Sequence, residues 1–227
     1  MNKSRTNAKI SGYALILMAL TAGFAVGFAF PKIYDKNHLA LLLKNFTENY
    51  GLYKLMLIGL SVTLVLDFLV SWTLYQFFKE AHKKIALLAF VLRIIYTFIF
   101  GIATYYLILN LKQGIDNKIL LENYNSFEKI WEAGLIIFGG HLFSIGLLMK
   151  LHKKIPMALW ILTLIAGVAY IIVHLLKIML PQQDEFTQML NNVLALPMAL
   201  GEICLAIWLI IKGGKQNEAK NANYPNK

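Results

Sequence analysis

Charged residues are scarce in this sequence. They account for 15% of its 227 residues, whereas about 25% is usual in a soluble domain, and apolar residues rise to 58%. This shortage excludes an ordinary water-soluble globular fold. Cysteine is scarcer still, because Cys204 stands alone, which excludes an internal disulfide.

Long polar segments are also missing, so the sequence leaves no room for a second folded domain beside its apolar stretches. A helix needs about 20 apolar residues to cross a hydrocarbon layer roughly 30 Å thick, and it satisfies its own backbone in lipid. The sequence therefore predicts an all-α membrane protein, a six-transmembrane-helix bundle, as one domain over residues 1–211. We expect residues 212–227 to be a disordered polar tail. The spans are predicted at about 10–30, 55–78, 85–111, 127–149, 156–178 and 193–211.

Acidic residues are few: 12 Asp and Glu stand against 22 Lys and Arg, for a net charge of +10. On a six-span chain, most of this excess falls on the side of both termini. Because basic loops are retained in the cytoplasm, we expect the N and C termini to be cytoplasmic. The basicity thus indicates topology and contact with the lipid bilayer, and we expect no nucleic-acid partner. The cations on that side are Lys3, Arg5, Lys9, Lys79, Lys83, Lys84, Lys150, Lys153, Lys154, Lys212, Lys215, Lys220 and Lys227.

Three shorter patterns accompany the spans. The first apolar run covers about 21 residues, which is too long for a cleaved signal, and its Ala19, Gly23 and Gly27 predict a face for close helix contact. The segment 38–50 has apolar residues on one helical face, which predicts a short helix at the outer interface or a lid over the bundle. The tetrapeptide HKKI occurs at 82–85 and again at 152–155, and positive charge on two tight cytoplasmic turns explains this repeat more simply than a duplicated hairpin.

Four ionisable residues lie near the middle of predicted spans: Asp67, Arg93, His141 and Glu202. A charge at such a depth costs at least about 2.5–3.5 kcal/mol, so intramembrane charges are usually paired and often functional. At about 1.5 Å per residue, all four fall at similar depths, between roughly 12 and 17 Å from the cytoplasmic ends of their helices. We therefore predict that they meet in one buried site.

The charges of this site do not balance. Asp67 and Arg93 belong to one hairpin and form the natural pair, because a guanidinium can hold a carboxylate by two hydrogen bonds. Glu202 is then a second acid, and with a neutral His141 the net charge is −1. Protonation of Glu202, protonation of His141 or a bound cation would each neutralise it. With Tyr96 beside Arg93, these five residues form the predicted proton or ligand site.

Neighbouring residues extend the prediction. On the fifth span, Tyr170 and His174 are weaker candidates for an outer vestibule. The second span carries a polar stripe and the sixth a face of small residues that would let another helix approach Glu202. These residues are Thr63, Asp67, Ser71 and Tyr75 on the second span, and Ala195, Ala199 and Ala206 on the sixth.

Enzymatic chemistry has less support. His141 and Glu202 are weak candidates for metal ligands, with Asp67 as a third, but one histidine is few for zinc. A haem held by His141 and His174 is disfavoured, because their predicted depths are roughly 12 and 27 Å. No nucleophile motif surrounds Ser71 or Ser144. We predict no catalytic residue and no cofactor.

Several blocks of the sequence resemble the prokaryotic membrane family called domain of unknown function 4386. The resemblance runs from about the second span to the sixth. It implies a multi-helix membrane protein of a bacterial or archaeal cytoplasmic membrane, and it implies no activity, cofactor or substrate. Here Gly140 precedes the histidine where a bulkier apolar residue is expected. The blocks are LDFLVSWTLYQFF, LLAFVLRIIYTFIFG, FGGHLFSIGLLM, IPMALWILTLIAGVAYII and LGEICLAIWLIIKG, and their most specific parts surround Asp67, Arg93 to Tyr96, His141 and Glu202.

Three functions are compatible with these observations. The favoured one is a multi-pass membrane protein whose buried charged site handles a proton, a small cation or a small polar ligand, as in a transporter or a sensor. The first alternative is a structural or partner-binding scaffold whose charges only clamp the fold. The second is an intramembrane metal-dependent hydrolase. A site that is dry and fully paired would favour the clamp.

Overall fold

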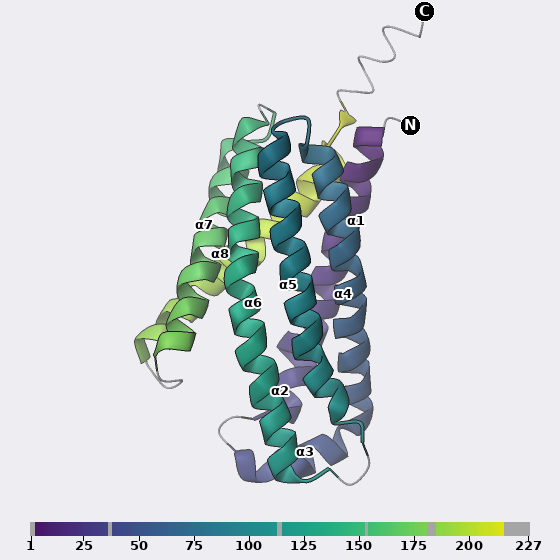
Figure 1. The fold of residues 1–227 in the computed structure, drawn as a ribbon, viewed down its shortest axis with the longest axis vertical. Coiled ribbons are helices and arrows are strands. Elements are labelled where there is room, and N and C mark those ends of the chain that lie inside the picture. The colour runs from purple at the N-terminus through teal and green to yellow at the C-terminus, as the bar shows by residue number, and fades with distance from the viewer. Residues whose placement is uncertain (1–2, 36–37, 113–114, 153, 181–184, 216–227) are drawn as a thin grey trace, which may run out of the picture.

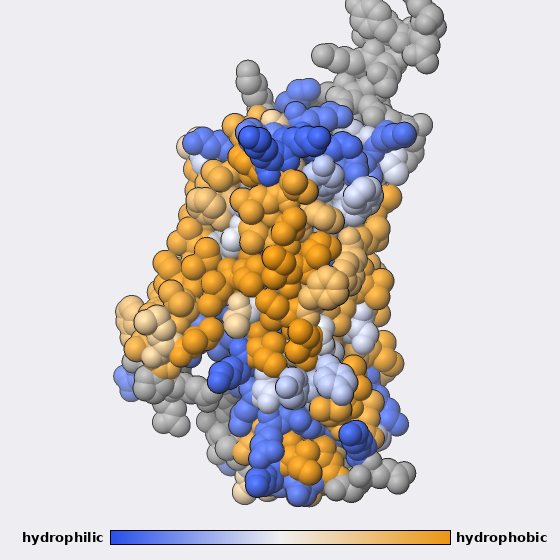
Figure 2. Space-filling model, in the orientation of Figure 1, coloured by the Kyte–Doolittle hydropathy of each residue, from blue (hydrophilic) through white to orange (hydrophobic). Residues whose placement is uncertain are grey.

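The protein consists of long helices that run between two ends of the molecule (Figure 1). The computed structural model describes residues 3–35, 38–112, 115–152, 154–180 and 185–215. In this part of the chain, six helices are long and apolar enough to cross a membrane. Figure 2 shows a broad apolar belt between hydrophilic residues at the two ends. The predicted all-α, six-helix membrane fold is confirmed.

The first crossing helix is α1 (Lys3–Ala22), which continues through the π-helical segment η1 (Gly23–Ala29) and the short α2 (Phe30–Ile33). The α6 and α8 helices begin well before their predicted spans, because their first turns carry polar residues that lower the local hydropathy. The predicted tail falls mostly on residues 216–227, outside the described residues. The remaining crossing helices are α4 (Tyr50–Phe78), α5 (Lys83–Leu109), α6 (Asn117–Leu151), α7 (Met157–Met179) and α8 (Glu185–Ile211).

The helices form a closed ring in chain order. Each packs on the one before and the one after it, and α8 closes the ring against α1. At the end that carries both termini, buried Arg5 donates hydrogen bonds to the carbonyls of Leu209 at 3.1 Å, Ile210 at 2.7 Å and Gly213 at 2.6 Å. These carbonyls end α8 without helical partners, and a cation is favourable there. Arg5 therefore joins the first helix to the last.

Close backbone contact unites α6 and α7. A Cβ added at Gly139 would lie 2.7 Å from the carbonyl oxygen of Gly167, and one at Gly167 would lie 2.6 Å from the amide nitrogen of Phe143. Real Cβ atoms do not approach that closely, so glycine is what lets these two helices touch. This contact fixes α6, which carries His141, against α7.

The predicted small-residue face on the first crossing helix is wrong, and the one on α8 is correct only in part. A Cβ at Gly23 or Gly27 would meet nothing within 4 Å, because Ala19, Gly23 and Gly27 all lie on the exposed side of the helix. On α8, Ala195 and Ala199 are exposed, whereas Ala206 is fully buried. The close approach to α7 is made instead by Gly201, where a Cβ would lie 2.8 Å from the Cβ of Ala166.

The end opposite the termini is covered by a short helix, α3 (Leu42–Glu48), preceded by the turn η2 (Leu39–Leu41) (Figure 1). Leu42 and Phe46 are buried against the bundle, which supports the lid interpretation of this segment. Beneath it, Asn110 donates to the hydroxyls of Tyr34 and Tyr53 at 3.0 and 3.2 Å. This buried polar network was not predicted from the sequence.

The α6–α7 contact gives a first prediction. Gly139→Ala forces a methyl group into the backbone of α7, and overpacking of this kind costs about 1–3 kcal/mol, so the thermal unfolding midpoint in detergent falls. Gly140→Ala is the matched control, because its Cβ would meet only Leu92 Cδ1 at an ordinary 3.5 Å. Equal midpoints for the two variants would contradict the contact.

Candidate functional site

Four charged or titratable side chains from four helices meet inside the ring. Arg93 of α5 lies at the centre and is fully buried. Its Nε donates to Asp67 Oδ1 at 2.9 Å, and its Nη2 lies 2.8 Å from the same oxygen. Its Nη1 donates to Glu202 Oε1 at 3.0 Å and lies 3.1 Å from His141 Nε2. The convergence predicted from the depths of these residues is thus observed.

The contacts of His141 define its protonation. Its Nδ1 lies 2.8 Å from the carbonyl oxygen of Ala89, and a carbonyl only accepts, so Nδ1 carries a proton. Its Nε2 faces an N–H of Arg93, so Nε2 is the acceptor. The ring is therefore neutral, and a protonated His141 would point an N–H at the guanidinium. Of the three ways to neutralise the site, protonation of His141 is the one that the geometry contradicts.

Arg93 uses all of its donors. A guanidinium has five N–H groups, and besides Asp67, Glu202 and His141 its Nη2 contacts Met18 Sδ of α1 at 3.8 Å. Its plane also lies over the ring of Phe138, 5.4 Å from the centroid. Neither Met18 nor Phe138 was predicted, because both read as ordinary apolar positions. Arg93 consequently contacts α1, α4, α6 and α8 from its place on α5.

Asp67 is only half satisfied. Both contacts from Arg93 reach Oδ1, whereas a guanidinium usually bonds the two oxygens of a carboxylate. Oδ2 is buried and has no hydrogen-bond partner among the described residues. A buried charged oxygen without a partner is costly, so this atom is where the site is incomplete.

Nearby hydroxyl groups do not complete the site. The hydroxyls of Ser71 and Ser144 donate to carbonyl oxygens one turn earlier on their own helices, at 2.6 and 2.8 Å. The hydroxyl of Thr97 does the same with the carbonyl of Arg93. Tyr96 is buried, but its hydroxyl accepts a 3.5 Å hydrogen bond from Trp131 and bonds none of the four charged or titratable residues. Tyr96 therefore lies beside the four charged or titratable residues, with its ring 4.8 Å from that of Phe138, and a role for it in the site stays a prediction.

Glu202 is the accessible member. Its side chain is 25% exposed, whereas those of Asp67 and Arg93 are 1% and 0% exposed. It stands five residues after Pro197, whose ring removes a helical hydrogen bond from the interior of α8. The half of α8 before Glu202 packs mainly on α7, in a small cluster of Ala169, Val173, Met198, Tyr170, Leu190 and Leu194.

Tyr170 and His174 lie further along α7, packed among aromatic rings. Their rings stack at 5.7 Å, and Tyr170 meets Phe138 edge to face at 5.2 Å. His174 is buried, and neither ring nitrogen has a partner among the described residues. Lys177 forms a 3.5 Å ion pair with Glu132, which links α7 to α6. Whether these residues line a vestibule stays a prediction.

The arrangement does not suit a metal. No group of three or more His, Cys, Asp or Glu side chains within the described ranges is placed to hold one. The free electron pair of His141 Nε2 already accepts from Arg93, and Glu202 shares that arginine. His141 and Glu202, the weak candidates for metal ligands, therefore already bond the guanidinium group of Arg93.

Six membrane-length helices around a buried ion cluster define a multi-pass membrane protein. The family model described as Domain of unknown function (DUF4386) matches residues 10–213, and the chain belongs to this family. A protein of Archaeoglobus fulgidus, itself described as uncharacterized, is 30% identical over 162 residues, which cover 71% of this chain and 86% of that protein. No solved structure matches the chain.

The assignment of His141 gives a second prediction. In ¹⁵N spectra of histidine-labelled protein, His141 shows a protonated Nδ1 and an unprotonated Nε2, and this pattern stays unchanged through the range in which histidines normally titrate. Arg93→Gln shifts the Nε2 resonance, because the guanidinium bond to it is lost. His82 is exposed and lies outside the site, so its signals serve as the internal comparison. A doubly protonated His141 in the wild type would refute the assignment.

Proposed function

We propose that the protein binds and releases a proton at the centre formed by Asp67, Arg93 and Glu202, as part of a proton-linked transporter or a membrane sensor. The observation that carries this proposal is the buried, unpartnered Oδ2 of Asp67 in a site with two carboxyl groups and one guanidinium. With a neutral His141, full ionisation leaves the site one negative charge in excess. A low-dielectric interior disfavours that excess.

A proton suits this centre better than a larger ligand. It can reside on Asp67 Oδ2 without displacing any contact, and it removes the negative charge from a buried oxygen that has no donor among the described residues. A desolvated metal cation would need several further oxygen ligands. The Ser71, Thr97 and Ser144 hydroxyls donate to carbonyls of their own helices, and none of them bonds Asp67 Oδ2.

Glu202 offers a route to the centre. Its side chain is the partly exposed member of the ion cluster, and Oε1 meets the cluster through Arg93 alone. Pro197 lies one and a half turns earlier and weakens the helix there. A small rotation of the part of α8 that follows Pro197 and carries Glu202 would release Glu202 from Arg93 and carry its proton out of the centre. Arg93 would then bind Asp67 alone and more strongly, which favours the ionised form of Asp67. The proton therefore moves between the two carboxyl groups, residing on Asp67 in one state and on Glu202 in the other.

A second candidate is a purely structural clamp. Arg93 contacts four other helices through hydrogen bonds, two ion pairs and a sulfur contact, and a buried charge with that many partners can fix one arrangement of a bundle. The partial exposure of Glu202 and the unpartnered Oδ2 are what this interpretation leaves unexplained.

The third prediction separates the two candidates. Infrared difference spectra of the protein in lipid, recorded as a function of pH, show a protonated-carboxyl C=O band that disappears as pH rises. Glu202→Gln and Asp67→Asn each remove or shift this band, because each leaves one carboxyl group for one guanidinium. Glu185→Gln, an exposed glutamate on the same helix, leaves it unchanged.

A pyranine-loaded liposome assay then tests whether the titration serves transport. We expect wild-type protein to carry protons across the bilayer in response to a pH step. We expect Glu202→Gln to slow this proton flux at least about tenfold. Absence of the carboxyl band at every pH, with unimpaired folding, would leave the clamp as the function of the cluster. A band without flux would favour a sensor over a transporter.

A further inference from the structure

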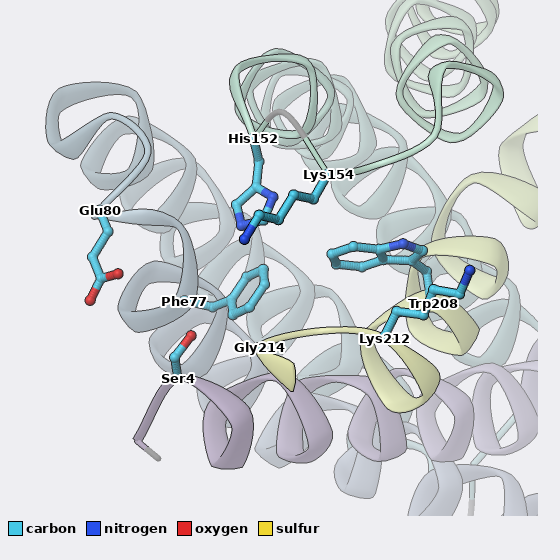
Figure 3. Close-up of a pocket in the computed structure, with 8 residues that line it drawn as sticks. All are labelled: Ser4, Phe77, Glu80, His152, Lys154, Trp208, Lys212 and Gly214. Atoms are coloured by element: carbon cyan, nitrogen blue, oxygen red, sulfur yellow. The ribbon is translucent and has the colours of Figure 1, made fainter. Parts of the chain in front are cut away.

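A separate pocket opens at the end of the bundle that carries both termini (Figure 3). It has a volume of about 150 Å³, several times what one water requires. This is the end that the lysine distribution predicts to be cytoplasmic. Four parts of the chain build it: the start of α1, the end of α4, the turn between α6 and α7, and the end of α8. Its lining residues are Ser4, Phe77, Glu80, His152, Lys154, Trp208, Lys212 and Gly214.

Two polar atoms of this lining are buried without partners. Trp208 is 7% exposed, and its Nε1, which can only donate, has no acceptor among the described residues. Nδ1 of His152 likewise has no partner there. Leaving a buried polar group unpaired costs about 1–3 kcal/mol. Two such atoms in one pocket indicate that the pocket is built for something that bonds them.

The charge of the lining indicates an anion. Lys154 and Lys212 are exposed, and within the described ranges neither forms an ion pair. Glu80 is the single acid of the lining and stands at the opposite side of the opening from Trp208 (Figure 3). Burial lowers the pKa of His152 below its ordinary 6.5, so the ring is neutral at neutral pH. The pocket thus offers two cations and an indole N–H against one carboxylate.

The two HKKI turns differ at this point. In the first, His82 is exposed and its ring accepts the amide of Ile85 at 3.3 Å to begin α5. In the second, His152 turns inward and its ring stacks on Phe77 at 5.6 Å, with Trp208 edge-on at 6.0 Å. Positive charge on a turn does not require a half-buried histidine between two aromatic side chains. The second turn therefore has a role that the repeat alone does not explain.

We propose that this pocket binds a phosphate-type anion, held by Lys154 and Lys212 and by the indole N–H of Trp208. Phosphate oxygens accept from both an ammonium group and an N–H. The anion comes either from the headgroup of an acidic phospholipid, since such lipids gather where lysines flank membrane helices, or from a free phosphate compound. Bound there, it joins the end of α8 to the α6–α7 turn.

Thermal unfolding of the full-length protein in detergent tests the site with two probes. One is inorganic phosphate, compared with chloride at equal ionic strength. The other is short-chain phosphatidylglycerol, compared with phosphatidylcholine. At about a hundredfold excess over Kd, we expect the unfolding midpoint to rise by about 5–10 °C. The double variant Lys154→Gln/Lys212→Gln, which changes two exposed residues, loses this rise. Trp208→Phe, which keeps an aromatic ring but removes the N–H, loses it as well.

The matched control is Lys83→Gln/Lys84→Gln, which removes two exposed lysines from the same end of the molecule outside the pocket. It retains the full rise. A rise with the lipid alone identifies a headgroup site, and a rise with phosphate alone identifies a site for a free phosphate compound. No rise with either probe, or an equal loss in the control variant, overturns the proposal. The lysine variants decide the outcome even where Trp208→Phe does not fold.

Discussion

The guanidinium group of Arg93 is the constraint on which the arrangement of this bundle depends. It is fully buried, so every one of its N–H groups must be satisfied by protein, and the partners come from α1, α4, α6 and α8. These partners are far apart in the sequence, and the ring of helices brings them to one level. A packing that separated these helices would leave a charged group unsatisfied in lipid. The same requirement that fixes the fold therefore also assembles the site.

The composition of this cluster favours the proposed proton site over a purely structural clamp. A clamp needs one acid for its one permanent cation, and Asp67 would suffice. Glu202 adds a second acid on a less tightly packed helix, where it is partly exposed, and Asp67 is left with a buried oxygen that nothing bonds. A neutral His141 supplies an acceptor without adding charge. Surplus acid and incomplete bonding are features that a purely structural cluster has no need of.

Much of the fold was predictable, because lipid leaves so few alternatives for a chain of this composition. Six helices and a shared depth for Asp67, Arg93, His141 and Glu202 both follow from hydropathy and from the rise of a helix. Small-residue faces were predicted less well. The spacing of Gly23 and Gly27 suggested close contact, but both lie on the exposed side of the helix, and Ala25 and Ala29 are the buried small residues. A regular spacing marks a helix face without indicating whether that face meets the bundle or the lipid.

The contacts within the site were harder to predict than the residues that form it. That Arg93 would bond one oxygen of Asp67 twice, or contact Met18 and Phe138, depends on side-chain rotamers set by the whole bundle. Tyr96 lies at the right position along α5, but its hydroxyl bonds Trp131. The pocket at the end of the bundle that carries both termini could not be predicted from the sequence, because its lining comes from four distant segments. Sequence periodicity places a residue on a helix face and says little about which neighbour it meets there.

A double-mutant cycle between Arg93→Gln and Glu202→Gln, measured by unfolding in detergent, tests the central claim most directly. The two residues are 109 positions apart in the chain, so a coupling between them reports their contact across the bundle. The account predicts a coupling free energy of at least about 1 kcal/mol. Effects that add to within about 0.5 kcal/mol would contradict it, because residues that share one buried ion cluster cannot be independent.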